Sequence, residues 1–199
     1  KGSNTSTKGG RKVGLKAIFL DRDGVITEDK GYTYLVEDLI FVPNAIRGLQ
    51  LLKACGYELF IVTNQGGIGL GKYTEDQFLK FTWAMLRELK ECGIDIKKVY
   101  YCPHRPDATV EKYKVDCGCR KPKNGMLIQA IKDFGIDVAN SWVIGDKESD
   151  IIAGKKTGVK TILVLTGEGT KHLSSSDVKP EYVAKDLLEA ARLISLLSS

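Results

Sequence analysis

The sequence predicts an α/β fold, a three-layer sandwich in which a parallel β-sheet lies between two layers of helices. Short, uniformly apolar runs recur along the chain, and an amphipathic helical segment follows most of them. This alternation is typical of parallel strands joined by right-handed crossovers, with ligands bound at the carboxyl ends of the strands. With 199 residues, 43% of them hydrophobic, the chain can bury one sizeable core, so we expect a single domain over residues 15–199.

The individual elements follow from local patterns. Five runs are too uniformly apolar to be half exposed and are expected to be strands: residues 16–20, 58–62, 99–101, 141–145 and 161–165. Helices are expected over residues 44–55, 74–92, 125–134, 149–157 and 185–197. Thr74 and Gln77 have the spacing of a capping box. A glycine suited to a left-handed C-terminal cap follows each of the first four helices: Gly56, Gly93, Gly135 and Gly158.

Charge and hydropathy argue against several kinds of partner. The formal net charge is +5, but four basic residues with no acid to offset them lie within residues 1–14, so the charge does not indicate nucleic-acid binding. We interpret residues 1–14 as a flexible tail or a cloning remnant. No apolar run approaches the roughly 20 residues that a membrane helix needs, and no signal peptide is apparent, so we expect a cytoplasmic protein with reduced cysteines.

Acidic side chains follow the expected strands. Asp21 and Asp23 come after the first strand, Thr63 ends the second, and Asp146 follows the fourth, with Asp150 one helical turn later. Clustered carboxylates repel one another unless a cation lies among them, and oxygen ligands suit Mg²⁺. A D-x-D pair alone would be compatible with the start of a solvated loop. The set at one edge of the sheet instead favours a metal-assisted site.

The same residues suit phosphoryl transfer. Asp21 can attack phosphorus while Asp23 gives a proton to the leaving oxygen, and Thr63 and Lys121 can hold the phosphoryl oxygens. A receiver-type domain, which accepts a phosphate without releasing it, also uses a strand-end aspartate, a threonine and a lysine. Asp23 favours an enzyme, because an adjacent acid and base promotes turnover.

A second cluster lies between residues 102 and 119. Cys102, His104, Cys117 and Cys119 are four ligands of the kinds that zinc prefers, and a filled set of four indicates a structural ion. Free thiols or a Cys117–Cys119 disulfide remain alternatives. The spacing does not suit a zinc-finger DNA reader, whose ligand pairs are followed by a basic helix.

Four segments together resemble the haloacid dehalogenase superfamily of phosphatases with an aspartate nucleophile: DRDG (21–24), VTNQGGIG (62–69), CRKP (119–122) and GDKESD (145–150). The CPH…CGC loop and the GY pair at residues 31–32 resemble, within it, the heptose bisphosphate phosphatases, relatives of the histidinol-phosphate phosphatases. The resemblance implies a Rossmann-like three-layer sandwich without a large cap domain, plus a zinc-binding loop.

The resemblance also implies roles for individual residues. Asp21 would be the nucleophile and a Mg²⁺ ligand, Asp23 the general acid and base and a ligand through its carbonyl, and Asp146 the third ligand. Thr63 and Lys121 would hold the transferred phosphoryl group. The remaining substrate contacts implied are Asp29, Lys30, Gly31, Tyr32, Asn64, Gln65, Gly66, Arg120 and Lys147.

The implied reaction is Mg²⁺-dependent removal of the 7-phosphate of D-glycero-D-manno-heptose 1,7-bisphosphate through an aspartyl-phosphate. Separately, we expect the protein to be a monomer. Histidinol phosphate or another small phosphorylated metabolite is the alternative. Arg120 favours a bisphosphate, because its planar fork can grip a second phosphate. Leu70, Lys30 and Tyr34 depart from the family pattern and affect the choice of substrate.

Several residues are expected to have no part in chemistry. Trp83 and Trp142 lie on apolar faces and are expected in the core, as are Cys55 and Cys92 near helix ends. His172 is expected in an exposed loop.

Overall fold

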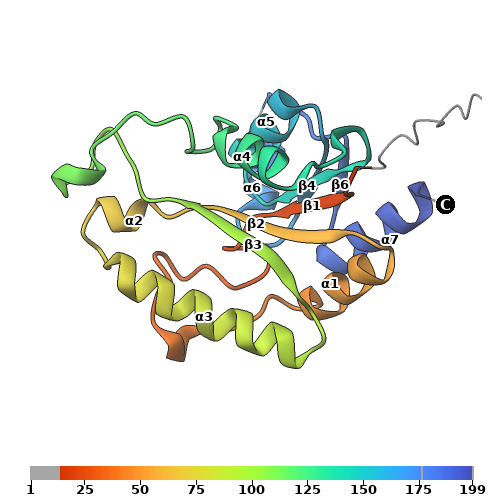
Figure 1. The fold of residues 1–199 in the computed structure, drawn as a ribbon, viewed down its shortest axis with the longest axis horizontal. Coiled ribbons are helices and arrows are strands. Elements are labelled where there is room, and N and C mark those ends of the chain that lie inside the picture. The colour runs from red at the N-terminus through yellow and green to blue at the C-terminus, as the bar shows by residue number, and fades with distance from the viewer. Residues whose placement is uncertain (1–13, 176, 199) are drawn as a thin grey trace, which may run out of the picture.

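The structure is a computed structural model that describes residues 14–175 and 177–198. A six-stranded sheet in the order β3-β2-β1-β4-β5-β6 forms its centre, and all neighbouring strands are parallel (Figure 1). The strands are β1 (Ala17–Leu20), β2 (Glu58–Asn64), β3 (Ile96–Cys102), β4 (Trp142–Gly145), β5 (Lys160–Val164) and β6 (Tyr182–Ala184). The expected parallel α/β sandwich is therefore confirmed.

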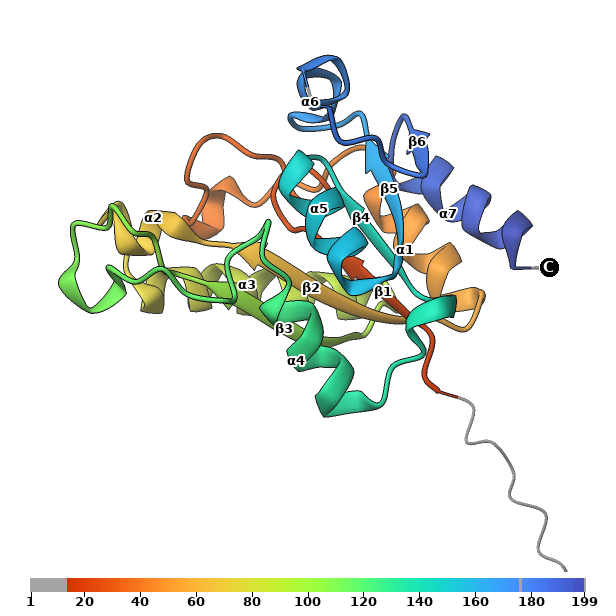
Figure 2. The same ribbon diagram turned by 90° about the horizontal axis from the view of Figure 1, so that it is seen from above.

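Helices cover both faces of the sheet. The longer helices are α1 (Ala45–Ala54), α3 (Glu75–Glu91), α4 (Gly125–Phe134), α5 (Glu148–Thr157) and α7 (Leu187–Leu197), and the shorter ones are α2 (Gly66–Gly69) and α6 (Gly169–Ser175). Helices α1, α3 and α7 lie on one side of the sheet and α4 and α5 on the other (Figures 1 and 2). Three short 3₁₀ turns lie at Val36–Asp38, Glu111–Tyr113 and Val138–Asn140.

The core follows from the alternation of side chains along the strands. In β1, Ile18 and Leu20 pack with residues of α1, α3 and α7, whereas Ala17 and Phe19 pack with residues of α4 and α5. All four are fully buried. A strand buried on both faces has to be uniformly apolar, and this explains why no polar residue interrupts it.

The topology places one crevice at the end of β1. The chain moves from β1 to β2 on one side and later returns to β4 on the other, so the strand order reverses beside β1. Ligands bind at such a switch point, outside the carboxyl ends of the strands. Two long connections, residues 21–44 and 103–124, gather with α2 at this end of the sheet (Figure 2).

Most expected elements are present, but some expectations were wrong. The 3-residue strand β6 and the short helices α2 and α6 were missed, because short segments carry little periodicity. His172 lies in α6, half-buried near Glu168, and not in an exposed loop. Cys92 is exposed, whereas Cys55 is partly buried against the core.

Trp83 was also placed wrongly in the core. Trp83 is 71% exposed on α3, whereas Trp142 is fully buried.

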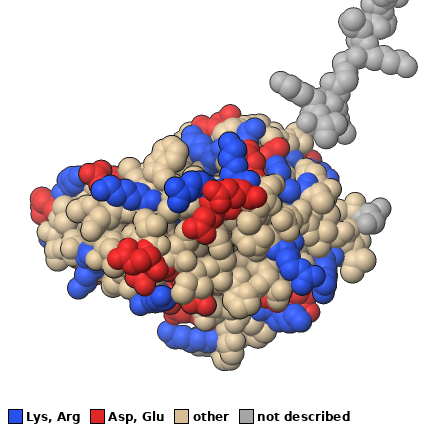
Figure 3. Space-filling view, turned by 90° about the horizontal axis from the view of Figure 1, so that it is seen from below, with Lys and Arg blue, Asp and Glu red and all other residues tan. Residues whose placement is uncertain are grey.

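The face of the molecule seen from below carries both positive and negative side chains, with uncharged surface between groups of them (Figure 3). Within the described residues, no helix is long and apolar enough to cross a membrane. Residues 1–13, most of the expected tail, lie outside the described residues.

Candidate active site

Asp21 lies directly after β1 and is paired with Lys121. The Lys121 Nζ lies 3.2 Å from Asp21 Oδ1 and 2.5 Å from Asp150 Oδ1, and it donates a hydrogen bond to the Val62 carbonyl at 2.6 Å. Burial lowers the pKa of Lys121, but the Asp150 and Asp21 carboxylates outweigh burial and raise it. A charged, fully buried ammonium group is therefore held beside the strand-end aspartate, where it can meet an anionic substrate.

Asp146, after β4, shares this crevice with Asp21. Its Oδ2 accepts a hydrogen bond from the Glu168 backbone at 2.9 Å, while its buried Oδ1 has no partner among the described residues. Burial and the nearby Asp21 raise the pKa of Asp146 to about 8. Ligand oxygens of Asp21, Asp146 and Asp150 lie within 4.8 Å of one another. A buried carboxylate oxygen without a partner, beside a second carboxylate, is the environment in which a divalent cation fits.

Two glycines leave room around Asp146. A Cβ added at Gly24 would lie 2.3 Å from Asp146 Oδ2, and one at Gly167 would lie 2.2 Å from the same atom. Both glycines also have positive φ, at +81° and +56°. A side chain at either position would collide with the candidate metal ligand as well as strain the backbone.

Asp23 lies at the edge of the crevice, and hydrogen bonds from Arg22 and Gln65 hold its carboxylate. Its side chain is 14% exposed and lines the cleft described below. Burial raises the pKa of Asp23, Arg22 opposes that effect, and the charge of Asp21 adds to it. Arg22 contacts one carboxylate oxygen of Asp23 and the Gln65 amide contacts the other.

Thr63, the penultimate residue of β2, is buried with its hydroxyl near this group. The Gln65 Nε2 donates to Thr63 Oγ1 at 3.0 Å. Because that hydrogen bond uses the hydroxyl oxygen as acceptor, the hydroxyl proton remains available for a phosphoryl oxygen.

A cleft of about 540 Å³ opens beside these residues. Its cationic lining includes Arg105, Arg120 and Lys147. The Lys147 Nζ lies 3.6 Å from Asp29 Oδ2 and 3.4 Å from Glu168 Oε1. Burial lowers the pKa of Lys147, but Asp21 and Asp146 outweigh burial and raise the pKa, so the lysine is charged.

Not every expected substrate residue faces this cleft. Asp29, Gly31, Tyr32, Asn64, Gly66, Arg120 and Lys147 line it. Lys30 is directed to Asp38 at 3.1 Å instead. Gln65 is 2% exposed, with its amide turned toward Asp23 and Thr63. Asn64 exchanges two hydrogen bonds with the Lys121 backbone, at 2.9 and 3.0 Å, so its side chain fixes the position of the lysine.

The turn at Gly66 and Gly67 forms part of the cleft wall. A Cβ at Gly66 would lie 2.8 Å from Arg105 Cδ and 2.9 Å from Arg120 Nη1. A Cβ at Gly67 would lie 2.3 Å from Tyr73 Cε1 and 2.7 Å from Tyr32 Cδ1. Side chains from both long loops, Arg105 and Arg120 from one and Tyr32 from the other, thus pack against a turn that carries no side chains.

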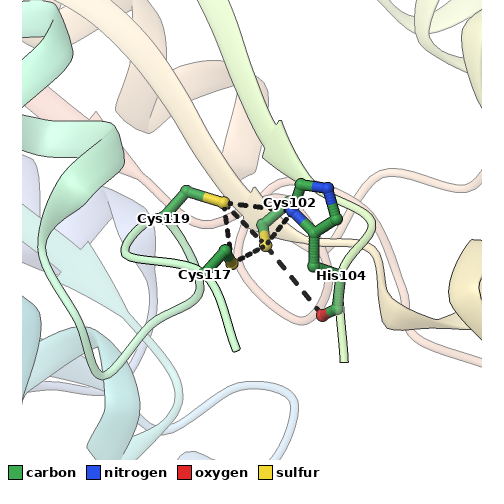
Figure 4. Close-up of side chains that lie close together, drawn as sticks. All are labelled: Cys102, His104, Cys117 and Cys119. Atoms are coloured by element: carbon green, nitrogen blue, oxygen red, sulfur yellow. Dashed lines mark hydrogen bonds between the residues drawn. The ribbon is translucent and has the colours of Figure 1, made fainter. Parts of the chain in front are cut away.

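The cysteine cluster forms a second candidate metal site. The Sγ atoms of Cys102, Cys117 and Cys119 lie 3.0 to 3.4 Å apart, and His104 Nδ1 faces them, 3.5 Å from Cys119 Sγ (Figure 4). All four ligand atoms lie within 4.8 Å of one another, and this donor set fits zinc. The 3.0 Å between Cys117 and Cys119 is too long for a disulfide, whose sulfurs are about 2.05 Å apart.

The loop that carries these ligands is tied to α2 and α4. The Thr109 and Val110 backbone amides both donate to the Gly69 carbonyl at 3.0 Å. The Gly125 amide at the start of α4 donates to the Gly118 carbonyl at 3.0 Å. Arg120 and Lys121 follow Cys119 directly, so the cluster sets the position of both basic residues.

Four residues with clear contacts in the site had no role assigned from the sequence: Arg22, Tyr73, Arg105 and Asp150. Asp150 pairs with Lys121, and Tyr73 donates to Gln65 Oε1 at 2.5 Å. The position of Asp150, one turn after Asp146, was the available signal in the sequence. The contacts of Arg22 with Thr33 and of Tyr73 with Gln65 depend on how separate segments meet, and no local pattern reports them. Arg105 holds Asp107, two residues later, and only the fold brings it to the cleft.

Comparison with known proteins agrees with this geometry. Residues 118–190 match the family model described as HAD-hydrolase-like. Over 186 residues the chain is 45% identical to D-glycero-beta-D-manno-heptose-1,7-bisphosphate 7-phosphatase of Pasteurella multocida (strain Pm70), covering 92% of this chain and 99% of the relative. It is 40% identical to the D-glycero-alpha-D-manno-heptose-1,7-bisphosphate 7-phosphatase of Photorhabdus laumondii, covering 90% of this chain and 97% of that protein.

A solved structure is similar over the same extent. The D,D-heptose 1,7-bisphosphate phosphatase from B. bronchiseptica, complexed with magnesium and phosphate, superposes with a TM-score of 0.83 at 28% identity, covering 93% of this chain and 100% of that one. The identity to the curated relatives extends over nearly the whole chain. The protein therefore belongs to the HAD-like hydrolases, in the family of the D-glycero-D-manno-heptose-1,7-bisphosphate 7-phosphatases.

Proposed function

We propose that this protein is a Mg²⁺-dependent phosphatase that removes the 7-phosphate of D-glycero-D-manno-heptose 1,7-bisphosphate through an aspartyl-phosphate at Asp21. The main support for the proposal is that Asp21, Lys121 and Asp146 lie close together at the carboxyl ends of β1 and β4. The names of the close relatives support the choice of substrate.

In the first step, a carboxylate oxygen of Asp21 attacks the phosphorus atom. The bond between phosphorus and the sugar oxygen breaks, and Asp23 gives its proton to that leaving oxygen. Lys121 and the Thr63 hydroxyl hold oxygens of the transferred group as negative charge develops on them. Lys121 needs little reorganisation, because Asp150 and the Val62 carbonyl already fix its ammonium group.

In the second step, a water molecule attacks the phosphorus of the aspartyl-phosphate. Asp23, now ionised, takes a proton from that water, the bond between phosphorus and Asp21 breaks, and inorganic phosphate leaves. The same carboxyl group thus serves as acid and then as base, and its starting protonation is restored at the end of the cycle.

Asp21, Asp146 and the Asp23 carbonyl would hold Mg²⁺. The ion would neutralise the carboxylates so that an anionic phosphate can approach. Asp150 lies in the same acidic cluster, but its contacts with Lys121 and the Lys147 amide indicate that it positions these residues.

A bisphosphate suits the distribution of positive charge in the cleft. Arg105, Arg120 and Lys147 line it in addition to the catalytic Lys121. A monophosphate such as histidinol phosphate would leave Arg120 and Lys147 without a second phosphate to bind, whereas Arg105 already holds the Asp107 carboxylate through two hydrogen bonds of 2.7 Å. Relatives named for each anomer of the heptose match this chain, so both anomers belong in the test.

Zinc at the cysteine cluster would be structural, because four protein ligands leave no open position for water or substrate. Its binding would order the segment that delivers Arg120 and Lys121. We also propose a cytoplasmic location, because a reducing compartment keeps cysteine ligands free to bind zinc.

The test is phosphate release from both anomers of the heptose bisphosphate and from histidinol phosphate. We expect the highest kcat/KM for a heptose bisphosphate, and the Asp21→Asn variant should lose activity to the assay background while keeping its thermal stability. Asp133→Asn, a surface change far from the cleft, is the matched control. A higher kcat/KM for histidinol phosphate would contradict the substrate, and an active Asp21→Asn variant would contradict the mechanism.

A further inference from the structure

We propose that Arg22 is a positioning residue for the general acid and base, and that its guanidinium fixes which oxygen of Asp23 carries the transferred proton. This inference rests on the proposed function, since it assumes that Asp23 transfers a proton. Arg22 stands between Asp21 and Asp23 in the sequence, but its side chain points into the protein and is 2% exposed.

Arg22 grips one oxygen of Asp23 through two nitrogens. Its Nε donates to Asp23 Oδ1 at 2.8 Å, and its Nη2 lies 2.7 Å from the same oxygen. The Nη2 also donates to the Thr33 carbonyl at 3.0 Å, so the guanidinium ties Asp23 to the middle of the 21–44 connection, here called the substrate loop. Two N–H groups on one carboxylate oxygen occupy its acceptor positions.

Gln65 contacts the other oxygen. Its Nε2 donates to Asp23 Oδ2 at 2.9 Å, and its Oε1 accepts from the Tyr73 hydroxyl at 2.5 Å and from Arg22 Nη2 at 3.4 Å. These contacts fix the orientation of the amide, so that nitrogen and not oxygen faces Asp23. Asp23 Oδ2 therefore receives one N–H and keeps an acceptor position, which makes it the oxygen that carries the proton.

The surroundings of Arg22 hold its plane in place. The guanidinium carbon lies 4.7 Å from the centre of the Phe81 ring and 5.6 Å from that of Phe78, both on α3. Its Nη1 is buried without a partner among the described residues. A buried donor without a partner is unfavourable, so a residue whose only task was to stabilise the fold would be better replaced by an apolar side chain.

The fixed orientation matters for proton transfer. A general acid must hold its proton within hydrogen-bond reach of the leaving oxygen, and small misplacements slow the reaction strongly. Lysine carries the same charge as Arg22 but has no planar fork, so it cannot hold Oδ1 through two parallel contacts. Charge and geometry can therefore be separated by substitution.

The experiment compares Arg22→Met and Arg22→Lys on two substrates of different leaving-group strength. With the heptose bisphosphate, whose sugar oxygen needs a proton to leave, we expect kcat to fall about 100-fold in Arg22→Met, with KM changing much less. In Arg22→Lys, kcat should stay at least about tenfold below the wild type, because lysine restores the positive charge but not the planar guanidinium that makes two contacts with Asp23.

With 4-nitrophenyl phosphate, the leaving group departs without protonation. The first step should then survive in both variants, and rapid mixing should show a burst of one nitrophenol per enzyme followed by slow turnover, since water attack still needs Asp23. Leu89→Ala, a core change on α3 away from the cleft, controls for lost stability and should keep the wild-type kcat with both substrates.

Three results would overturn the proposal: wild-type kcat for the bisphosphate in Arg22→Met, full recovery in Arg22→Lys, or loss of the nitrophenol burst together with sugar turnover. The third would indicate general damage to the site. These outcomes are separate from a failure of the proposed function, which would appear as activity in Asp21→Asn.

Discussion

Magnesium binding should compete with a proton on Asp146. Burial and Asp21 raise the pKa of this carboxyl to about 8, far above its ordinary value of 3.8. In the metal-free protein the site therefore holds a proton at neutral pH, and Mg²⁺ must displace it. Because the folded-state pKa is raised, the metal-free protein should lose stability as the pH rises from about 4 to about 8.

The size of the effect follows from that pKa. At pH 8 about half of the molecules carry the proton, and at pH 6 about 99% do, so the apparent Mg²⁺ affinity should weaken about 50-fold between these values. Binding should release about one proton per Mg²⁺ at pH 6 and about half a proton at pH 8. Asp146→Asn removes both the ligand and the proton, so its weaker binding should depend far less on pH.

Titration calorimetry in two buffers with different ionisation enthalpies measures the affinity and the proton release together. Asp133→Asn is the matched control, because the pKa of this exposed aspartate is lowered to about 2 by hydrogen bonds from Tyr100, Lys98 and Gln129. That variant should bind Mg²⁺ as the wild type does at each pH. An affinity that stays constant between pH 6 and pH 8, with no proton released, would refute the reasoning.

Two further predictions concern the cysteine cluster and a glycine. Cys117→Ser should reduce the zinc content, measured by elemental analysis, from about one equivalent to near zero and should lower the thermal stability. The control Cys92→Ser, at an exposed cysteine, should leave both quantities unchanged. Zinc retained in Cys117→Ser would contradict the structural zinc site. Gly167→Ala should weaken Mg²⁺ binding about tenfold, because its Cβ would meet Asp146 Oδ2. Gly135 also has a positive φ, but a Cβ there would meet no other atom, so Gly135→Ala should lower stability without changing Mg²⁺ binding. Equal Mg²⁺ affinities in the two glycine variants would count against the argument.

Much of the fold could be predicted because its signals are local. The Thr74 capping box is present, and Gly56, Gly93, Gly135 and Gly158 all have positive φ as expected. Parallel strands bring their carboxyl ends to one edge, and this rule sufficed to bring Asp21 and Asp146 together from positions 125 residues apart. Local patterns and topology thus located the crevice.

Other features depend on tertiary contacts that no local pattern reports. Trp83 belongs to an apolar stripe, yet its position on α3 faces outward, so periodicity alone placed it in the core. Lys30 and Gln65 were expected at the substrate because of their motifs, but the loop geometry turns Lys30 to Asp38 and Gln65 to Asp23. The buried role of Arg22 emerges only when β1, the substrate loop and α3 are assembled.

The turn at Gly66 and Gly67 has a consequence for how this family can change its substrates. The walls of the cleft are arginines and tyrosines from separate loops, and the spacing between them depends on two missing methyl groups. Adding a single carbon at Gly66 would displace Arg105 and Arg120, which have no hydrogen bond to the nucleophile or the acid among the described residues. A carbon at Gly67 would also displace Tyr73, whose hydroxyl orients Gln65 beside Asp23. Selectivity and chemistry can therefore diverge by separate mutations in this scaffold.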